Sequence, residues 1–294
     1  MRGMRTVLPD LSIRQLEYLV AVTEHETWAV AADEVGVTAS ALSQGLSELE
    51  RRLGIPLFER SGRRRVLRTA AAPVLDHARQ VLAITGDLAR WAERSRDADA
   101  GSLRVGMIDV AAVHHFANTL HAFRDSHPDL NLHLRVAPSG TLIELLTGGL
   151  LDVVVCVEPV DPIRGIETTP VITEELGIYR PHGKRAGSPT TWGPWVLFPD
   201  GSHTRSLVTS ELRQLGAPIE VIAESHQPEV LREMVQLGLG WTVLPVVQAE
   251  TGERPLERAR VLTRRRLVSA TRAGTAPDPA VSAILDALVA DERT

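Results

Sequence analysis

Residues 31–60 read AADEVGVTASALSQGLSELERRLGIPLFER, and this stretch decides the architecture of the N-terminal part of the chain. Apolar residues in its second half recur three or four positions apart, as on one face of an α-helix. They are Ala39, Leu42, Leu46, Leu49 and Leu53. Before them, Gly36 can adopt the left-handed conformation that ends a preceding helix in a tight turn. Because two helices joined by a short glycine-containing turn form a helix-turn-helix, we predict that unit, with its second helix beginning near Thr38.

Two shorter helices are expected before this one. The first begins after Ser12, which is a suitable N-cap residue, and the second begins at Thr27. Both follow the i, i+3, i+4, i+7 pattern of one helix face. The apolar faces consist of Leu16, Leu19, Val20 and Thr23 in the first helix and of Trp28, Ala31, Ala32 and Val35 in the second.

The side of the third helix opposite its leucines is polar and uncharged. Short polar groups can approach base edges or phosphates with little loss of hydration. The candidate DNA contacts here are Thr38, Ser40, Ser43, Gln44 and Ser47, followed by Arg51. Without Arg or Lys in its first three turns, the helix has no donor for the strongest bidentate contact to guanine. If the sequence ended at residue 50, a three-helix bundle with a solvated polar face would be the preferred interpretation.

The residues after this helix supply positive charge. Two short extended pieces surround a glycine turn at Ser61-Gly62 and predict a β-wing. The net charge of the chain is −5, yet residues 51–68 contain seven Arg and one Glu, a local density of cations that suits phosphate contact. The candidate contacts on the wing are Arg60, Arg63, Arg64 and Arg65. Their guanidinium groups can bind phosphates or enter a narrow minor groove, although a merely solvated charged face would also explain the charge run.

Two segments resemble the DNA-binding module of LysR-type transcriptional regulators. They are residues 31–43, AADEVGVTASALS, and residues 49–60, in which LE-x-x-LG-x-PLF-x-R is the specific pattern. The chain has Thr38-Ala39 where the family usually has Ser-Gln, Gln44 where it often has Arg, and RTAAA at residues 68–72 where it has Leu-Thr-x-Ala-Gly. The departures concern base contacts and not the fold. The resemblance implies a sequence-specific DNA-binding transcription regulator controlled by a small-molecule effector that is not identified.

Length and composition fit such a protein. A chain of 294 residues with 44% hydrophobic and 23% charged residues fits two or three packed globular units. It has no apolar run near the 18 or so residues of a membrane span, and MRGMRTVLPD lacks the apolar region of a signal peptide. We therefore expect a cytoplasmic protein with no membrane partner. The single cysteine, Cys156, cannot form an intrachain disulfide, and its apolar surroundings predict a core residue.

A long helix is predicted from Thr69, as its N-cap, to about Arg94, with Pro73 in the first turn. Its apolar positions alternate in steps of four and three, as in a coiled coil. They are Val74, Ala78, Val81, Thr85, Leu88 and Ala92. The resemblance implies a dimer through this helix, a further tetramer, and two DNA-binding modules on the half-sites of a promoter inverted repeat. Alternatively, the stripe packs on the C-terminal domain of the same chain.

The remaining residues predict an α/β effector domain. Strands at 103–107, 130–136 and 152–157 alternate with helices, which favours a parallel, doubly wound sheet. A second alternation begins near Ile163, and the two lobes should enclose a cleft, as in periplasmic-binding-protein-like folds. GSLRVG at 101–106, GGLLD at 148–152 and MVQLGLG at 234–240 resemble landmarks of the LysR effector domain. The predicted boundaries are 1–68 for the winged helix-turn-helix, 69–100 for the linker helix and 101–294 for the effector domain, with lobe I at 101–161 and 266–294 and lobe II at 162–265.

Ligands of such sheets bind at the carboxyl ends of the strands, against helix N-termini. The candidate effector contacts at these ends are Asp109, Val110, Ser139, Gly140, Thr141 and Glu158 in lobe I, and Ser202, His203, Thr204 and His226 in lobe II. Helix N-termini favour anions, but Asp109 and Glu158 at the mouth of the cleft would repel a carboxylate. We therefore hypothesise a neutral or cationic effector.

Other groupings point to no further chemistry. His114, His115 and His121 lack a Cys or carboxylate at ligand spacing, so no metal site is expected. No G-x-S-x-G or similar nucleophile motif occurs, so neither an enzyme nor a cofactor is expected. Arg264-Arg265-Arg266 is expected on a solvated strand end. The alternative function is a soluble solute-binding protein or small-molecule enzyme with an N-terminal helical interaction module, against which the Arg63-Arg64-Arg65 wing and the motif at 36–60 argue.

Overall fold

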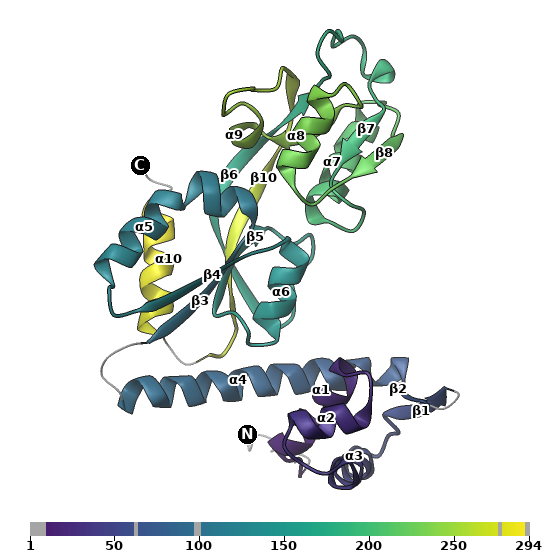
Figure 1. Ribbon diagram of the computed structural model, residues 1–294, viewed down its shortest axis with the longest axis vertical. Coiled ribbons are helices and arrows are strands. Elements are labelled where there is room, and N and C mark those ends of the chain that lie inside the picture. The colour runs from purple at the N-terminus through teal and green to yellow at the C-terminus, as the bar shows by residue number, and fades with distance from the viewer. Residues whose placement is uncertain (1–9, 62–63, 97–100, 276–277, 292–294) are drawn as a thin grey trace, which may run out of the picture. The chain divides into compact units, whose positions relative to one another are not determined.

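The computed structural model describes residues 10–61, 64–96, 101–275 and 278–291. The chain divides into two compact units, one of residues 1–92 with 147–149 and one of the other residues. We call them, after their predicted functions, the DNA-binding unit and the effector domain, and Figure 1 labels their helices and strands. Among the described residues, no helix is both long enough and apolar enough to span a membrane.

The DNA-binding unit begins with the three predicted helices, α1 (Ile13–Glu24), α2 (Trp28–Glu34) and α3 (Ala39–Leu53). Each begins after a capping side chain, and the hydroxyl oxygens of Ser12, Thr27 and Thr38 accept backbone N–H bonds from the first turn. Gly36 has φ 66° and lies in the turn between α2 and α3, so the predicted helix-turn-helix is confirmed.

The wing follows α3 as an antiparallel pair, β1 (Phe58–Ser61) and β2 (Arg64–Leu67). The carboxylate of Glu50 on α3 accepts N–H bonds from Leu57 at 2.7 Å and from Phe58 at 3.1 Å, which ties the helix to the wing. Leu57 is fully buried in the same core as the α3 leucines. The fold class of a winged helix-turn-helix is therefore confirmed.

The linker helix α4 (Ala72–Arg96) differs from its prediction at its start and in its stripe. A 3-10 turn, η1 (Thr69–Ala71), precedes it, so Thr69 is not its N-cap. Val74 and Ala78 pack into the core of the DNA-binding unit. The exposed apolar residues further along α4 are Val81, Ile84, Leu88 and Trp91. The exposed stripe thus shares Val81 and Leu88 with the predicted one.

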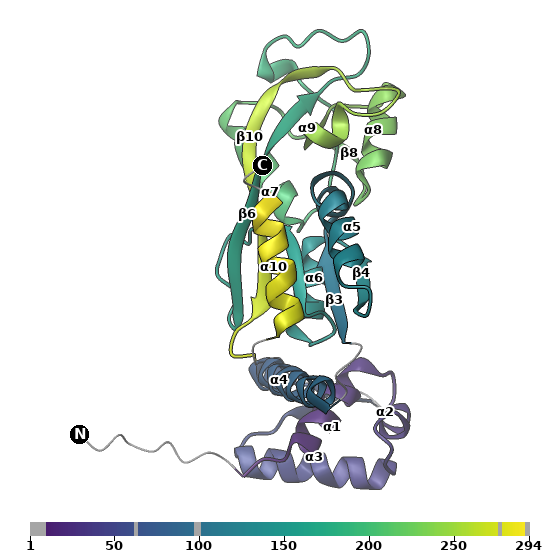
Figure 2. The ribbon, with the colours of Figure 1, turned by 90° about the vertical axis from the view of Figure 1, so that its left-hand side faces the viewer.

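The effector domain contains one six-stranded sheet in the order β4-β3-β5-β10-β6-β9, together with a parallel pair β7-β8 (Figures 1 and 2). The strands are β3 (Ser102–Met107), β4 (Asn131–Val136), β5 (Val153–Val157), β6 (Ile166–Tyr179), β7 (Trp195–Leu197), β8 (Val221–Glu224), β9 (Thr242–Pro245) and β10 (Arg258–Arg272). The β3, β4 and β5 strands are parallel, as predicted.

The two long strands β6 and β10 were not predicted. They pair antiparallel over their full length, and β10 also pairs antiparallel with β5, so the sheet is mixed and not wholly parallel. β10 contains six arginines, and β6 contains one proline and three glutamates, residue types that are depleted in strands. Tertiary pairing therefore overrides the local preference of β6.

The helices of the effector domain pack in separate groups. A π-helical turn, η2 (Ala111–His115), α5 (Ala117–Ser126), α6 (Ser139–Thr147) and α10 (Pro279–Asp291) pack around β3, β4 and β5. In Figures 1 and 2, α10 lies beside α5. Cys156 is fully buried in β5, as predicted. The helix α7 (His203–Gln214) packs in a second core with Trp195 and Trp241, and the helices α8 (Pro228–Gln236) and α9 (Val246–Ala249) pack in a third core with Tyr179 and Val196.

Candidate functional site

The polar face of α3 is accessible in the DNA-binding unit. The side chains of Ser40, Gln44 and Ser47 are exposed, and Ser43 is half-buried. Thr38 is exposed too, but its hydroxyl oxygen accepts the N–H of Ala41 at 3.2 Å. Thr38 therefore caps the start of the helix, and the exposed polar groups of this face follow it.

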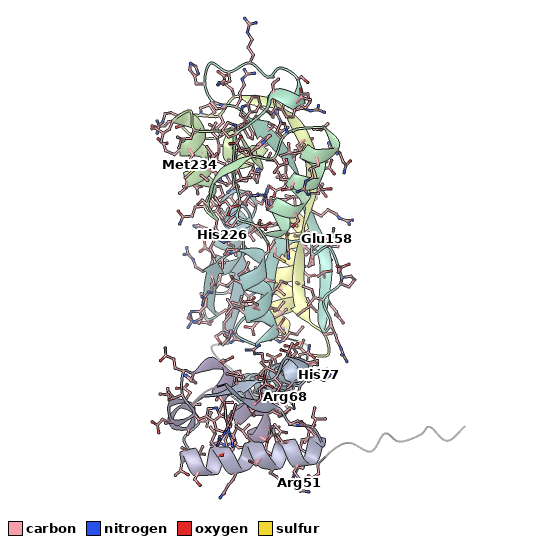
Figure 3. All side chains as sticks on the ribbon, turned by 90° about the vertical axis from the view of Figure 1, so that its right-hand side faces the viewer. Arg51, Arg68, His77, Glu158, His226 and Met234 are labelled. Atoms are coloured by element: carbon pink, nitrogen blue, oxygen red, sulfur yellow. The ribbon has the colours of Figure 1, made fainter. Side chains whose placement is uncertain are left out.

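Arg51 is exposed on α3 (Figure 3) but already has an acidic partner. Its guanidinium group donates two hydrogen bonds to the Glu48 carboxylate, at 2.5 and 2.6 Å. Arg52 also donates to Glu48, and the hydrogen bonds of Arg51 and Arg52 lower the pKa of Glu48 to about 2. Arg51, a predicted DNA contact, is therefore already engaged in an ion pair within α3.

On the wing, Arg60 and Arg65 are direct neighbours across the two strands, and both are exposed. Like charges in this position repel unless an anion lies between or above them. Arg65 also stacks on Trp28, whereas no ion pair of Arg60 is found within the described residues. The predicted contacts Arg63 and the side chain of Arg64 lie outside the described residues.

A cavity of about 610 Å³ opens in the effector domain at the carboxyl ends of β3 and β4. Nine of the ten effector contacts predicted from the sequence line this cavity. They are Asp109, Val110, Ser139, Gly140, Thr141, Ser202, His203, Thr204 and His226. Gln248, Phe198 and Arg265 line it as well, and no strand-end argument pointed to these three residues.

Two serines at helix starts shape the cavity walls. Ser139, at the start of α6, accepts the N–H of Val157 through its hydroxyl oxygen at 3.2 Å. Ser202 is the N-cap of α7 and accepts the N–H of Arg205 at 3.1 Å. The N-termini of α6 and α7 therefore both meet the cavity, where their unpaired N–H groups make the wall electropositive.

Glu158 does not join this cavity, contrary to the strand-end expectation. Its carboxylate accepts a hydrogen bond from Arg266 at 2.7 Å and lines a separate pocket. Figure 3 shows Glu158 and His226 at opposite edges of the effector domain. The backbone N–H of Glu158 pairs with the carbonyl of Arg266, and this register turns Glu158 toward β10. The hypothesis of a neutral or cationic effector used both Asp109 and Glu158, and of these two carboxylates only Asp109 lines the cavity.

The arginine cluster 264–266 lies within β10 and not at a solvated strand end. Arg265 is 6% exposed, and its Nε donates to the equally buried Glu174 of β6 at 2.6 Å. Its Nη1 donates to the Thr204 hydroxyl. His115 bonds the other Glu174 oxygen at 2.8 Å. Residues of η2, β6, β10 and α7 are thus joined in one buried polar network beside the cavity.

The charge of Glu174 is stabilised within this network. Burial on its own would raise the pKa of the carboxyl group, but the Arg265 charge and the hydrogen bonds from His115 and Arg265 lower the pKa overall. Removing either partner would leave the other as an uncompensated buried charge, which is costly.

Asp109 lies half-buried at the end of β3, and the side-chain amide of Gln248 donates a hydrogen bond to it. Burial raises the pKa of Asp109, and the negative charge of Glu229 raises it further. The His114 charge and the Gln248 bond act in the opposite direction without cancelling the shift. Asp109 is thus a carboxylate in an unfavourable environment.

Two of the three histidines noted in the sequence pair with carboxylates. His115 bonds Glu174, and His121 pairs with Asp125 one helical turn away at 2.9 Å. Across the described ranges, no group of three or more His, Cys, Asp or Glu side chains is arranged to hold a metal ion.

Each of the two units matches a known protein family. Residues 13–72 match the family "Bacterial regulatory helix-turn-helix protein, lysR family", and residues 96–293 match the family "LysR substrate binding domain". A relative from Streptomyces viridosporus, a probable hydrogen peroxide-inducible genes activator, is 31% identical over 250 residues, which cover 82% of this chain and 80% of that protein.

Solved structures share the fold. A full-length OxyR variant from Pseudomonas aeruginosa has a TM-score of 0.64 at 23% identity, and the match covers 96% of this chain and 95% of that one. Full-length CbnR in complex with its target DNA has a TM-score of 0.63 at 20% identity, and the match covers 96% of this chain and 100% of that one.

Proposed function

Because the chain belongs to the LysR family of bacterial transcriptional regulators, we propose that α3 and the wing bind promoter DNA while the cavity of the effector domain binds a small molecule. The family assigns the general function: the protein is a DNA-binding transcription regulator with an effector-binding domain, and the alternative of a solute-binding protein or enzyme is not favoured. We further propose that the protein catalyses no reaction and acts in the cytoplasm.

The single observation that supports the DNA contacts is that Arg65, paired with Arg60 across the wing, lines one pocket with Ser43 of the polar α3 face. Phosphate oxygens would relieve the repulsion between the two guanidinium groups. The uncharged groups Ser40, Gln44 and Ser47 would meet base edges, where a glutamine can bind adenine through two hydrogen bonds. Affinity would come mainly from the wing and base discrimination mainly from α3.

We propose that the exposed stripe of α4 forms the dimer contact. Val81, Ile84 and Leu88 follow one another at spacings of three and four residues, and their exposed fractions are 40%, 42% and 57%. Apolar residues at this spacing form the seam of paired helices. A dimer would present two DNA-binding units to the two halves of an inverted repeat.

We propose that the regulator responds to a bound ligand and not to thiol oxidation. The Streptomyces viridosporus relative is a probable hydrogen peroxide-inducible genes activator, but the cysteine of this chain is unsuited to sensing peroxide. Cys156 is the only cysteine of the chain and is fully buried, and burial raises the pKa of its thiol to about 12. The thiolate is the species that reacts with oxidants, and it is scarce here near neutral pH.

The proposal is tested by fluorescence anisotropy with the full-length protein and DNA from upstream of its own gene. We expect salt-dependent binding, and we expect Gln44→Ala to weaken binding to this DNA by about 1–3 kcal/mol with little effect on unrelated DNA. Gln214→Ala, which removes an exposed glutamine from the effector domain, is the matched control. Binding that is equally weak for both DNAs with the wild type would refute sequence-specific recognition.

A further inference from the structure

We infer that the effector is a small amino carboxylate whose protonated amine pairs with Asp109 and whose oxygen atoms bind the wall formed by Arg265, Ser139 and Ser202. The inference rests on the proposed function, since it takes the 610 Å³ cavity as the effector site. It extends that function by assigning a chemical class to the effector and one side chain to each end of it.

Asp109 indicates the place of the amine. The neutral amide of Gln248 donates a hydrogen bond to it, and the like charge of Glu229 opposes its ionisation. His114 acts on Asp109 only through its charge, and within the described part of the chain no Arg, Lys or His forms an ion pair with this carboxylate. A half-buried carboxylate in such a place gains most from a cation, and a ligand ammonium supplies both the charge and up to three N–H donors.

Arg265 indicates the place of the ligand oxygen atoms. Its Nε and Nη1 donate to Glu174 and Thr204, and no described residue accepts a hydrogen bond from its Nη2. Arg265 is 6% exposed and lines the cavity, so an oxygen acceptor that reaches it would be well shielded from water. Charge-assisted hydrogen bonds in such places are among the stronger ones.

The hydroxyl groups of Ser139 and Ser202 add donors to the same wall. Each already accepts a backbone N–H through its oxygen, so its hydroxyl hydrogen is available to a ligand oxygen. Both serines stand at helix N-termini, which favour negative charge. The other acidic residues of the lining, Glu144 and Asp200, are exposed and screened by solvent.

Neither a simple carboxylate nor a simple amine matches the whole cavity. A carboxylate without an amine would add a second negative charge near Asp109, which has no ion-pair partner among the described residues. An amine without an acceptor would displace water from the donors of Arg265, Ser139 and Ser202 and leave them unpaired, which is costly in a buried site. A molecule with both groups satisfies both walls.

The test uses full-length protein and three matched sets of probes in thermal-shift and calorimetric titrations. The sets are the twenty protein amino acids, the amines that remain after loss of their carboxyl groups, and the carboxylates that remain after loss of their amino groups. We expect at least one amino acid to bind and both of its truncated counterparts to bind about tenfold more weakly or worse.

Two variants locate the contact. Asp109→Asn keeps an oxygen acceptor for Gln248 but removes the charge, and we expect it to weaken binding of the amino acid by about tenfold or more. Asp129→Asn removes the same charge from an exposed position outside the cavity and should leave binding unchanged. A carboxylate without an amine that binds as tightly as its amino acid, undiminished binding by Asp109→Asn, or a panel in which nothing binds would each overturn the inference.

Promoter-DNA binding by wild type and Asp109→Asn is measured in parallel. If both bind the DNA and the probes fail, the assignment of an amino carboxylate is wrong and the proposed function stands. If neither binds DNA, the proposed function itself is wrong.

Discussion

The guanidinium group of Arg65 lies over the indole ring of Trp28, with its Cζ atom 5.2 Å from the ring centroid. The same indole meets Phe58 of the wing edge to face, with ring centroids also 5.2 Å apart. The wing is therefore fixed to α2 by an aromatic contact and a cation–π contact. This arrangement holds Arg65 in place beside Arg60, its cross-strand neighbour.

Arg65→Ala should weaken binding to every DNA sequence by a similar factor. A phosphate contact carries no sequence information. Each phosphate contact that is lost makes the negative slope of log affinity against log salt concentration less steep by about 0.9. The measurement is anisotropy at several salt concentrations with promoter and unrelated DNA. Arg264→Ala, which removes an exposed arginine from the effector domain, is the charge-matched control. Weaker binding to the promoter DNA alone would assign Arg65 to base recognition and contradict the prediction.

Leu88→Glu should shift the protein from dimer to monomer. Leu88 is 57% exposed in the single chain, and burying such a side chain stabilises an association by about 1.5–3 kcal/mol on each helix. Placing a carboxylate in the seam would add a desolvation cost. Sedimentation velocity over a range of concentrations measures the change. Ala89→Glu, which adds the same charge at the next and also exposed position, should remain dimeric; if both variants behave like the wild type, the dimer contact lies elsewhere.

The sequence predicted the elements of this fold where local signals agree with the final packing. Ser12, Thr27 and Thr38 are caps by type and by position, and the α3 leucines have the period of their buried face. The long strands β6 and β10 could not be found in this way. Their register joins residues about 90 positions apart, such as Glu174 and Arg265, and no local pattern reports such a pairing.

In the candidate cavity, too, some residues follow from local sequence order and others depend on distant segments. The rule that ligands sit at strand ends named Asp109, Ser139 and Ser202, because it depends only on the order of strands and helices. It failed for Glu158, since the direction of a side chain one residue past a strand depends on the neighbouring strand, here β10. It also missed Arg265 and Gln248, which reach the cavity from distant segments.

Glu174→Gln should destabilise the effector domain at neutral pH by about 3–5 kcal/mol, because Arg265 would remain as a buried charge without its partner. The pKa of Glu174 is lowered in the folded protein, so its charge stabilises the fold above the pKa of about 4.3 of an unfolded glutamate. That contribution is lost as the pH falls through the lower, folded-state pKa. Urea unfolding followed by tryptophan emission at several pH values measures it.

The difference in unfolding free energy between wild type and Glu174→Gln should therefore be largest near neutral pH and shrink on acidification below about pH 4. Glu175→Gln is the control, since the neighbouring Glu175 is only partly buried and pairs with Arg264 and Arg258 near the protein surface. Surface pairs contribute little to stability, so this variant should differ from the wild type by about 1 kcal/mol or less. A difference for Glu174→Gln that does not change with pH would show that the carboxylate charge is not the cause.

Hydrogen peroxide should leave promoter binding by the wild-type protein unchanged. Cys156 is fully buried between strands of the central sheet, and burial raises the pKa of its thiol to about 12. Near neutral pH the thiol is therefore protonated and shielded, and only unfolding should expose it to reagents. The checks are alkylation of the cysteine with and without urea, read by mass spectrometry, and anisotropy with promoter DNA before and after peroxide. Cys156→Ala serves as the reference in both. If peroxide altered DNA affinity in the wild type but not in Cys156→Ala, the lone cysteine would be a sensor after all, and regulation by a bound ligand alone would be wrong.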